Sequence, residues 1–299
     1  MSELLLQTRN LTKQYGRHRA VDDVNMHIKK GAIYGFIGRN GAGKTTCLKM
    51  ISGLSTPSYG EIEMFGYKGK DLQKVRSRVG CLIEAPGLYG NMSAYDNLNI
   101  KCKLTGIKKK GYIEELLKTV GLDTVGEKKT KHYSLGMKQR LGIALALVGE
   151  PDLLILDEPI NGLDPQGIVE VRETIQKLAK ERGMTICISS HILEELSKIA
   201  TDYGIIHNGC LVQELTREEL MKKCSERIEL TLDNPKQAVP VLDDMGFSSY
   251  QVIDKEHIHI FERLNMELAK AGIPVKGISI TSEELENYFL RLTGGDNRA

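Results

Sequence analysis

The chain has 299 residues, 41% hydrophobic and 27% charged, a balance typical of a globular protein. Its formal net charge of +2 is too close to zero to indicate a nucleic acid or another highly charged partner. Nowhere do about 18 apolar residues follow one another, so no segment of the sequence is expected to span a bilayer. If the chain works at a membrane, another polypeptide must cross it.

The six cysteines are scattered, without the Cys-x-x-Cys spacing of zinc sites and redox pairs. Several lie within apolar runs, where a thiol behaves as a small buried hydrophobe. We therefore expect a reducing compartment. The first residues, Met1-Ser2-Glu3, have neither the basic nor the apolar segment of a signal peptide, so none is predicted.

Residues 4–15 predict an opening strand, and a phosphate-binding loop is predicted soon after it. The pattern G-x-x-x-x-G-K-[ST] is matched by Gly38-Arg39-Asn40-Gly41-Ala42-Gly43-Lys44-Thr45, followed by Thr46. Without a Cβ at Gly41 and Gly43, the backbone can wrap closely and turn its N–H groups onto phosphate oxygens. Lys44 would supply positive charge to the β- and γ-phosphates, and Thr45 a hydroxyl to Mg²⁺. This loop predicts binding of ATP or GTP.

The elements around the loop have the order that such a site requires. Residues 32–37 are mostly apolar and typical of a buried strand. From Thr46 onward apolar residues recur at helical spacing until Gly53, so a helix N-terminus faces the phosphates. A glycine-rich turn without a ligand is the alternative, which this order disfavours. Tyr15 could stack on the base, although its position alone favours a partly buried structural tyrosine.

Three later strands are predicted to end in polar residues, where open α/β sheets place their ligands. The strands cover residues 79–83, 153–156 and 184–188, and the polar residues after them are Glu84, Asp157 with Glu158, and Ser189-Ser190-His191. Acids beside buried strands need a ligand or solvent. Asp157 is predicted to hold Mg²⁺ through water, and Glu158 to orient or deprotonate the attacking water. A lone histidine usually has a structural role. His191, however, follows the third predicted strand that ends in polar residues, which favours a role in the site.

Helices are predicted between these strands. Residues 92–132 are expected to contain helices, the first capped by Ser93. Ser134 is expected to cap a helix that runs towards Pro151, and its N-terminus with Gly136 is a potential anion site, although alone it is more often only a capped helix. An amphipathic helix is expected over 169–179. Residues 203–212 predict a hairpin with an Asn-Gly turn.

The composition shifts after Leu220. A β-α-β-β-α-β order predicts a small α+β domain of ferredoxin-like pattern, with strands over 227–232, 250–253, 257–261 and 275–280 and helices over 236–245 and 265–271. A last helix, capped by Thr281 or Ser282, is expected to reach Leu292. His257 and His259 alternate on a strand, but a metal pair there lacks a third ligand.

Over about residues 4–220, the chain resembles the ATP-binding subunit of an ABC transporter. The motifs follow the family's order: the adenine-stacking aromatic at Tyr15, Walker A at 38–45, the signature at 134–140, Walker B and the catalytic glutamate at 153–158, the D-loop at 161–164 and the switch histidine at His191. The resemblance reverses the structural interpretation of Tyr15. It implies an α/β fold, with a P-loop NTPase core, an antiparallel β subdomain and a helical subdomain at about 90–150. Residues 1–222 would form this ATP-binding domain and residues 223–299 the small C-terminal domain.

The resemblance also assigns the site, with ATP and Mg²⁺ as cofactors. The expected nucleotide contacts are Tyr15, Gly38, Arg39, Asn40, Gly41, Ala42, Gly43, Lys44, Thr45, Thr46, Glu84, Ser134, Gly136 and Asp157. Thr45, Glu84 and Asp157 would face the metal. Lys44, Glu158 and His191 would be catalytic, with His191 contacting the γ-phosphate.

Two departures point to one branch of the family. Glu84 replaces the usual Q-loop glutamine, and the signature reads Ser134-Leu135-Gly136-Met137 instead of Ser-Gly-Gly-Gln. Both variations, and the tail over 284–293, resemble the bacitracin-resistance and lantibiotic-immunity exporters, which protect bacteria from membrane-active peptides. An ionised glutamate only accepts hydrogen bonds and is unfavourable towards a γ-phosphate. We therefore expect Glu84 to face the metal or its water.

The resemblance implies partners as well. An ATP-dependent homodimer, or a heterodimer with a second ATPase subunit, would hold each nucleotide between Walker A of one subunit and the Ser134 helix end of the other. A separately encoded membrane subunit would dock near residues 84–99, with this chain peripheral on the cytoplasmic face. One alternative is a soluble ABC ATPase acting on ribosomes or DNA, but neither two ATPase halves nor a long coiled coil occurs. A second alternative is an ABC exporter of an unrelated substrate. A third is a regulatory role for the C-terminal domain.

Overall fold

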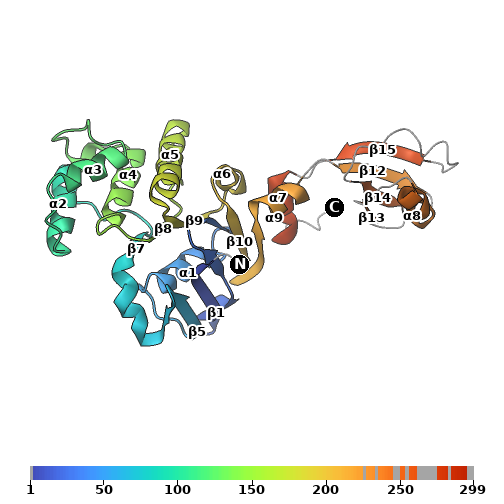
Figure 1. The fold of residues 1–299 in the computed structure, drawn as a ribbon, viewed down its shortest axis with the longest axis horizontal. Helices are drawn as coiled ribbons and strands as arrows, with labels where there is room; N and C mark the ends of the chain where they lie inside the picture. The colour runs from blue at the N-terminus through green and yellow to red at the C-terminus, as the bar shows by residue number, and fades with distance from the viewer. Residues whose placement is uncertain are drawn as a thin grey trace. The chain divides into compact units, whose positions relative to one another are not determined.

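The computed structural model describes residues 3–224, 227–232, 235–244, 250–252, 256–260, 275–281 and 284–294. The chain divides into two compact units, Met1–Arg217 and Glu218–Ala299 (Figure 1). Helix α7 (Arg217–Lys223) spans the division, and the domain boundary predicted after residue 222 falls within this helix. Within the described ranges, no helix is both long and apolar enough to cross a membrane.

A six-stranded sheet forms the centre of the first unit, in the order β11-β10-β4-β9-β8-β7. Its strands are β4 (Ile33–Ile37), β7 (Val79–Leu82), β8 (Leu153–Asp157), β9 (Thr185–Ser190), β10 (Asp202–His207) and β11 (Cys210–Thr216). The first five are parallel, and β11 returns antiparallel after the predicted Asn208-Gly209 turn. Every residue of β4, β8 and β9 is buried, as expected of central parallel strands. The carboxyl ends of the parallel strands therefore lie along one edge of the sheet.

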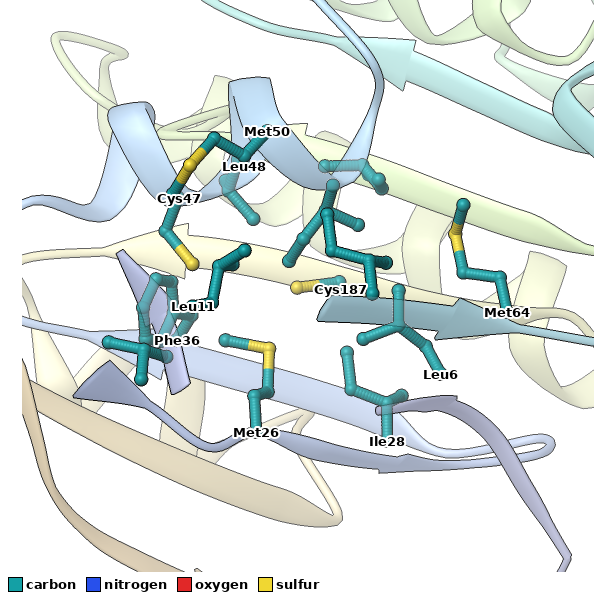
Figure 2. Close-up of a cluster of buried hydrophobic side chains, with 14 of the residues drawn as sticks. Leu6, Leu11, Met26, Ile28, Phe36, Cys47, Leu48, Met50, Met64 and Cys187 are labelled. Atoms are coloured by element: carbon teal, nitrogen blue, oxygen red, sulfur yellow. The ribbon is translucent and has the colours of Figure 1, made fainter. Parts of the chain in front are cut away.

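An antiparallel sheet packs against this core through α1 (Lys44–Ile51). It contains β1 (Leu4–Tyr15), β2 (His18–Val24), β3 (His27–Lys29), β5 (Tyr59–Met64) and β6 (Tyr67–Lys68), and η1 (Gly69–Arg78) follows it. Figure 2 shows Leu6 and Ile28 of this sheet, and Met26 between β2 and β3, in one cluster with side chains from α1 and the central sheet. Cys47 and Leu48 of α1 are fully buried there. Helix α1 is thus held by apolar contacts from two sheets.

Three helices gather beside β7 at one end of the unit (Figure 1). They are α2 (Ala94–Leu104), α3 (Tyr112–Thr119) and α4 (Leu135–Ala146), with η2 (Thr130–His132) before α4. Both predicted caps are confirmed. The Ser93 hydroxyl accepts from the Asp96 backbone N–H while the Asp96 carboxylate accepts from the Ser93 N–H, and Ser134 Oγ accepts from the Met137 N–H.

Helix α5 (Pro165–Arg182) is longer than the predicted 169–179. The Asp164 carboxylate accepts from the Gly167 N–H at 3.1 Å, and Pro165 occupies the first helical position, where no N–H is needed. Gly183 ends the helix with φ 61°. The short α6 (Leu193–Ser197) follows β9.

The second unit contains an antiparallel sheet in the order β13-β14-β12-β15. The strands are β12 (Arg227–Leu232), β13 (Tyr250–Val252), β14 (His257–Ile260) and β15 (Val275–Thr281). Helix α8 (Pro235–Asp244) corresponds to the helix predicted over 236–245 and contains Pro240. The helix predicted over 265–271 lies outside the described residues, so the ferredoxin-like domain stays a prediction.

The predicted cap of the last helix is wrong. Helix α9 (Leu285–Leu292) has Glu284 at its N-cap, without a side-chain hydrogen bond. Thr281 ends β15 instead, because it pairs with Arg227 of β12. Ser282 lies outside the described residues.

Candidate active site

The phosphate loop joins β4 to α1, as the sequence predicts, and its path leaves no space for a side chain at Gly38 or Gly43. Gly43 has φ 106°, and a Cβ there would lie 2.5 Å from the Ala20 carbonyl oxygen. A Cβ on Gly38 would lie 2.6 Å from the Ile206 carbonyl oxygen. Lys44 closes the loop, since its Nζ donates to the Gly38 carbonyl at 2.6 Å.

Of the three side chains predicted to be catalytic, Lys44 and His191 both contact the third, Glu158. Lys44 Nζ lies 3.0 Å from Glu158 Oε1, and His191 Nδ1 lies 2.8 Å from Glu158 Oε2. Only 5% of the Lys44 side chain and 19% of the Glu158 side chain are exposed, so solvent screens their attraction weakly. The carboxylate that would act on water is thus held between two nitrogen groups that come from α1 and from the residue after β9.

Thr45 and Asp157 form the second part of the site. Thr45 Oγ1 donates to Asp157 Oδ2 at 2.7 Å, and Asp157 is buried. Within the described part of the chain, no group of three or more His, Cys, Asp or Glu side chains could hold a metal by itself. A hydroxyl and a carboxylate oxygen fit Mg²⁺, which keeps waters and takes phosphate oxygens as further ligands.

Ser189 contacts both candidate acids, and our sequence analysis did not assign it a role. Its fully buried hydroxyl donates to Asp157 Oδ1 at 2.6 Å and accepts the Glu158 N–H at 2.9 Å. Glu158 itself has φ 49°, a conformation that non-glycine residues rarely adopt. Ser189 therefore fixes both acids, and a buried serine in an aliphatic strand beside an acidic strand end was the available signal.

The Glu84 side chain pairs with a lysine, Lys49, although we predicted that it faces the metal together with Thr45 and Asp157. It follows β7 with φ 63°, and Lys49 Nζ donates to its Oε1 at 2.5 Å. This hydrogen bond and the negative charges of Glu84 and Asp157 raise the pKa of Lys49. The structure brings Thr45 and Asp157 together but pairs Glu84 with Lys49.

Of the remaining predicted contacts, Tyr15 and Ser134 lie at the surface, whereas Gly136 is buried. Tyr15 is 54% exposed at the end of β1, with Lys13 Nζ 5.2 Å from its ring centre, so the partly buried structural role is wrong. Ser134 is exposed, and its hydroxyl bonds within its own helix. A Cβ on Gly136 would meet Gly167 at 3.5 Å, so its packing partner is the start of α5.

A glycine loop between a buried parallel strand and a helix, with acids at the carboxyl ends of other strands of the same sheet, defines a P-loop nucleotide hydrolase. Comparison with known proteins narrows the class: the chain belongs to the ATP-binding subunits of ABC transporters. A profile described as ABC transporter matches residues 21–161. The chain is an ATPase coupled to transport, as the sequence predicted.

Several relatives extend over most of the chain. It is 44% identical to the bacitracin transport ATP-binding protein BcrA of Bacillus licheniformis, over 97% of this chain and 98% of the relative. It is 46% identical to the lantibiotic transport ATP-binding protein SrtF of Streptococcus pyogenes, over 70% of this chain and 90% of the relative. These similarities confirm the predicted resemblance to the bacitracin and lantibiotic branch.

Solved structures confirm the predicted fold class. The structure of an ATP-binding subunit of an ABC transporter aligns with TM-score 0.64 and 31% identity, over 73% of this chain and 92% of that chain. A dimeric, post-hydrolysis structure of the ATP-binding cassette MJ0796 bound to ADP and Pi aligns with TM-score 0.64 and 25% identity, over 71% of this chain and 98% of that chain.

Proposed function

We propose that this chain hydrolyses ATP with Mg²⁺ to power a separate membrane subunit that exports a bacitracin- or lantibiotic-type peptide. The similarity to a bacitracin transport protein along nearly the whole chain, including the second unit, carries the assignment of the substrate class. The relatives act in transport, which argues against the alternative of an ATPase acting on ribosomes or DNA.

The contacts of Lys44 suggest how nucleotide binding activates the site. In this structure Lys44 donates to the Gly38 carbonyl and neutralises Glu158. A γ-phosphate would compete for Lys44, leaving the Glu158 carboxylate free to accept a proton from the attacking water. His191 would keep this carboxylate oriented through its contact at 2.8 Å.

Thr45 and Asp157 would hold Mg²⁺, with Asp157 acting through water. When bound, the ion would neutralise charge on the phosphate oxygens. Ser189 would keep Asp157 in place, because its hydroxyl donates to the carboxylate oxygen that does not accept from Thr45. The buried carboxylate therefore has a fixed direction before the nucleotide arrives.

The exposed start of α4 supports a dimer as the complete site. The Ser134 hydroxyl occupies the Met137 N–H, so this helix end would offer its remaining first-turn N–H groups to the phosphates of a nucleotide on another subunit. An ATP-dependent homodimer would complete two such sites. The similar MJ0796 cassette is described as dimeric with ADP and Pi, which supports this arrangement.

A groove beside β7 is the proposed docking place of the membrane subunit, with this chain peripheral on the cytoplasmic face. Its volume is about 380 Å³, and residues of β7, the segment after it, α2 and α4 line it. Leu54, Tyr89 and Leu104 expose 65%, 56% and 79% of their surface at the groove. Such a concentration of exposed apolar side chains is typical of a protein interface.

A drug-sensitivity experiment tests the function. A strain lacking this chain would be complemented with the wild type or with Glu158→Gln, and growth measured against bacitracin, a lantibiotic and an unrelated lipophilic drug. We expect the wild type alone to restore protection against one of the peptides. Protection against the unrelated drug alone would identify an exporter of another substrate class.

A further inference from the structure

The ion pair between Lys49 and Glu84 is the feature of the site that the proposed mechanism does not use. The two residues are 35 positions apart and meet at 2.5 Å, from the last turn of α1 and the residue after Ile83. Glu84 is 64% exposed and Lys49 34% exposed at their side chains. Exposed ion pairs in general contribute little to the stability of the fold. Any role of this ion pair must therefore come from where it lies in the site.

Helix geometry places the Lys49–Glu84 ion pair beside Thr45 and Asp157, the candidate metal ligands. Thr45 and Lys49 are four residues apart on α1, so their side chains project from the same face, one turn from each other. Thr45 binds Asp157 at the end of β8, and Lys49 binds Glu84 after β7. β7 and β8 are neighbouring parallel strands. One face of α1 therefore makes two hydrogen bonds to acids at the carboxyl ends of adjacent strands.

The negative charges around the nucleotide position suggest a role for the contact between Lys49 and Glu84. Asp157, Glu158 and Glu84 all lie around the position where a nucleotide with several negative charges would bind. Lys44 neutralises Glu158 at 3.0 Å, and Thr45 and Ser189 donate to Asp157. Glu84 would repel the phosphates unless a cation accompanied it. A glutamine at this position would need no such cation, because its amide is neutral.

We propose that Lys49 is the positioning residue for Glu84. Its ammonium lets a glutamate occupy the glutamine position beside the nucleotide without repelling ATP, and it fixes the segment after β7 to the helix that carries Lys44 and Thr45. Ala85 and Pro86, which follow Glu84, line the docking groove, so the pair joins the nucleotide helix to that groove. This proposal rests on the proposed nucleotide site.

A double-mutant cycle on nucleotide affinity tests the proposal without relying on hydrolysis. The chain has no tryptophan, so the probe is a fluorescent, non-hydrolysable ATP analogue titrated in the presence of Mg²⁺. The proteins are the wild type, Lys49→Met, Glu84→Gln and the double variant. We expect Lys49→Met to weaken binding at least about threefold more in the wild-type background than in the Glu84→Gln background. Lys49→Arg should retain wild-type affinity.

Lys109→Met is the matched control, because it breaks an exposed Lys109–Glu150 ion pair at 3.1 Å outside the site. Its affinity should equal that of the wild type. Lys49→Gln replaces Lys49→Met in the cycle if circular dichroism shows that the Met variant is unfolded. Equal effects of the Lys49 substitution in both backgrounds would overturn the role of Lys49 while leaving the nucleotide site intact. A folded wild type that does not bind the analogue would contradict the proposed function itself, and this proposal with it.

Discussion

Ser189 lies directly opposite Asp157 in the pairing of β9 with β8, and its hydroxyl donates to that carboxylate at 2.6 Å. The same oxygen accepts the backbone N–H of Glu158 at 2.9 Å. One buried hydroxyl thus holds both Asp157, the candidate metal ligand, and Glu158, the candidate catalytic base. The first prediction concerns this serine.

Ser189→Ala removes a donor from a buried carboxylate and leaves the Glu158 N–H unsatisfied. Loss of a buried hydrogen-bond partner costs about 1–3 kcal/mol, so we expect a lower free energy of unfolding. ATP hydrolysis should fall by about tenfold or more, because both acids lose their fixed direction. Urea unfolding and steady-state ATPase assays measure the two effects. Ser197→Ala, which loses a hydroxyl bonded to the Glu194 carbonyl in α6, should leave the rate unchanged.

Glu158→Gln and Glu84→Gln remove one negative charge each and conserve shape. We expect Glu158→Gln to lower ATP hydrolysis by at least about 100-fold, because an amide cannot accept the proton of the attacking water. Glu84→Gln should keep most of the activity, since glutamine is the usual residue there. Phosphate release with both proteins at equal concentration is the measurement. An equally inactive Glu84→Gln protein would show that the Glu84 carboxylate has its own chemical role.

Tyr15→Ala tests whether the exposed tyrosine stacks on the base. Stacking of a base on an aromatic ring is worth about 1–3 kcal/mol in nucleic-acid complexes, so ATP affinity should fall by about tenfold. Affinity for inorganic tripolyphosphate should not change, because it has no base, and Tyr15→Phe should bind ATP like the wild type. Competition titrations with both ligands make the comparison. Equal weakening for ATP and tripolyphosphate would place Tyr15 in the phosphate site instead.

Tyr203→Phe tests a pH effect on stability. Burial raises the pKa of Tyr203 from 10.0 to about 12, and its hydroxyl donates to the Ala200 carbonyl. As the pH rises, the Tyr203 hydroxyl therefore loses its proton in the unfolded chain before it does so in the folded chain. The stability that Tyr203 contributes through its raised pKa is complete below pH 10 and is lost as the pH rises towards 12. Urea midpoints across this range should fall less steeply for Tyr203→Phe. Parallel curves for the two proteins would refute the assignment.

Leu104→Glu tests the groove beside β7. A charge at this 79% exposed position of α2 should weaken association with the membrane subunit and leave the ATPase activity of the isolated chain unchanged. Co-purification with the tagged membrane subunit is the measurement. Leu4→Glu, a substitution at an exposed leucine of β1 outside the groove lining, is the control. Normal co-purification of Leu104→Glu would argue against this docking site.

Local patterns in the sequence predicted the parts of the site that depend on neighbouring residues. The glycine loop before α1, the buried β8 and the Ser134 cap all follow from residues within one short segment. The helix predicted from residue 169 in fact begins at Pro165, because a proline at the first helical position after an Asp cap begins α5.

The contacts between distant segments could not be predicted in the same way. Ser189 meets Asp157 across 32 positions, and Lys49 meets Glu84 across 35. The first contact depends on the register of the parallel strands β8 and β9, and the second on how α1 packs beside the end of β7; no local pattern encodes either. We predicted Glu84 beside the metal because its charge was considered without its partner.

Helix α1 has apolar side chains packed by both sheets, with Cys47 and Leu48 fully buried (Figure 2). Shifting such a helix would break close-packed contacts on two sides at once, and protein interiors resist this strongly. The helix is therefore the stationary frame of the site. Rearrangements on binding and release of ATP should occur where side chains of α1 meet the polar residues after β7, β8 and β9. Spin labels on those segments would move relative to α1, whereas pairs between α1 and either sheet would keep their separation.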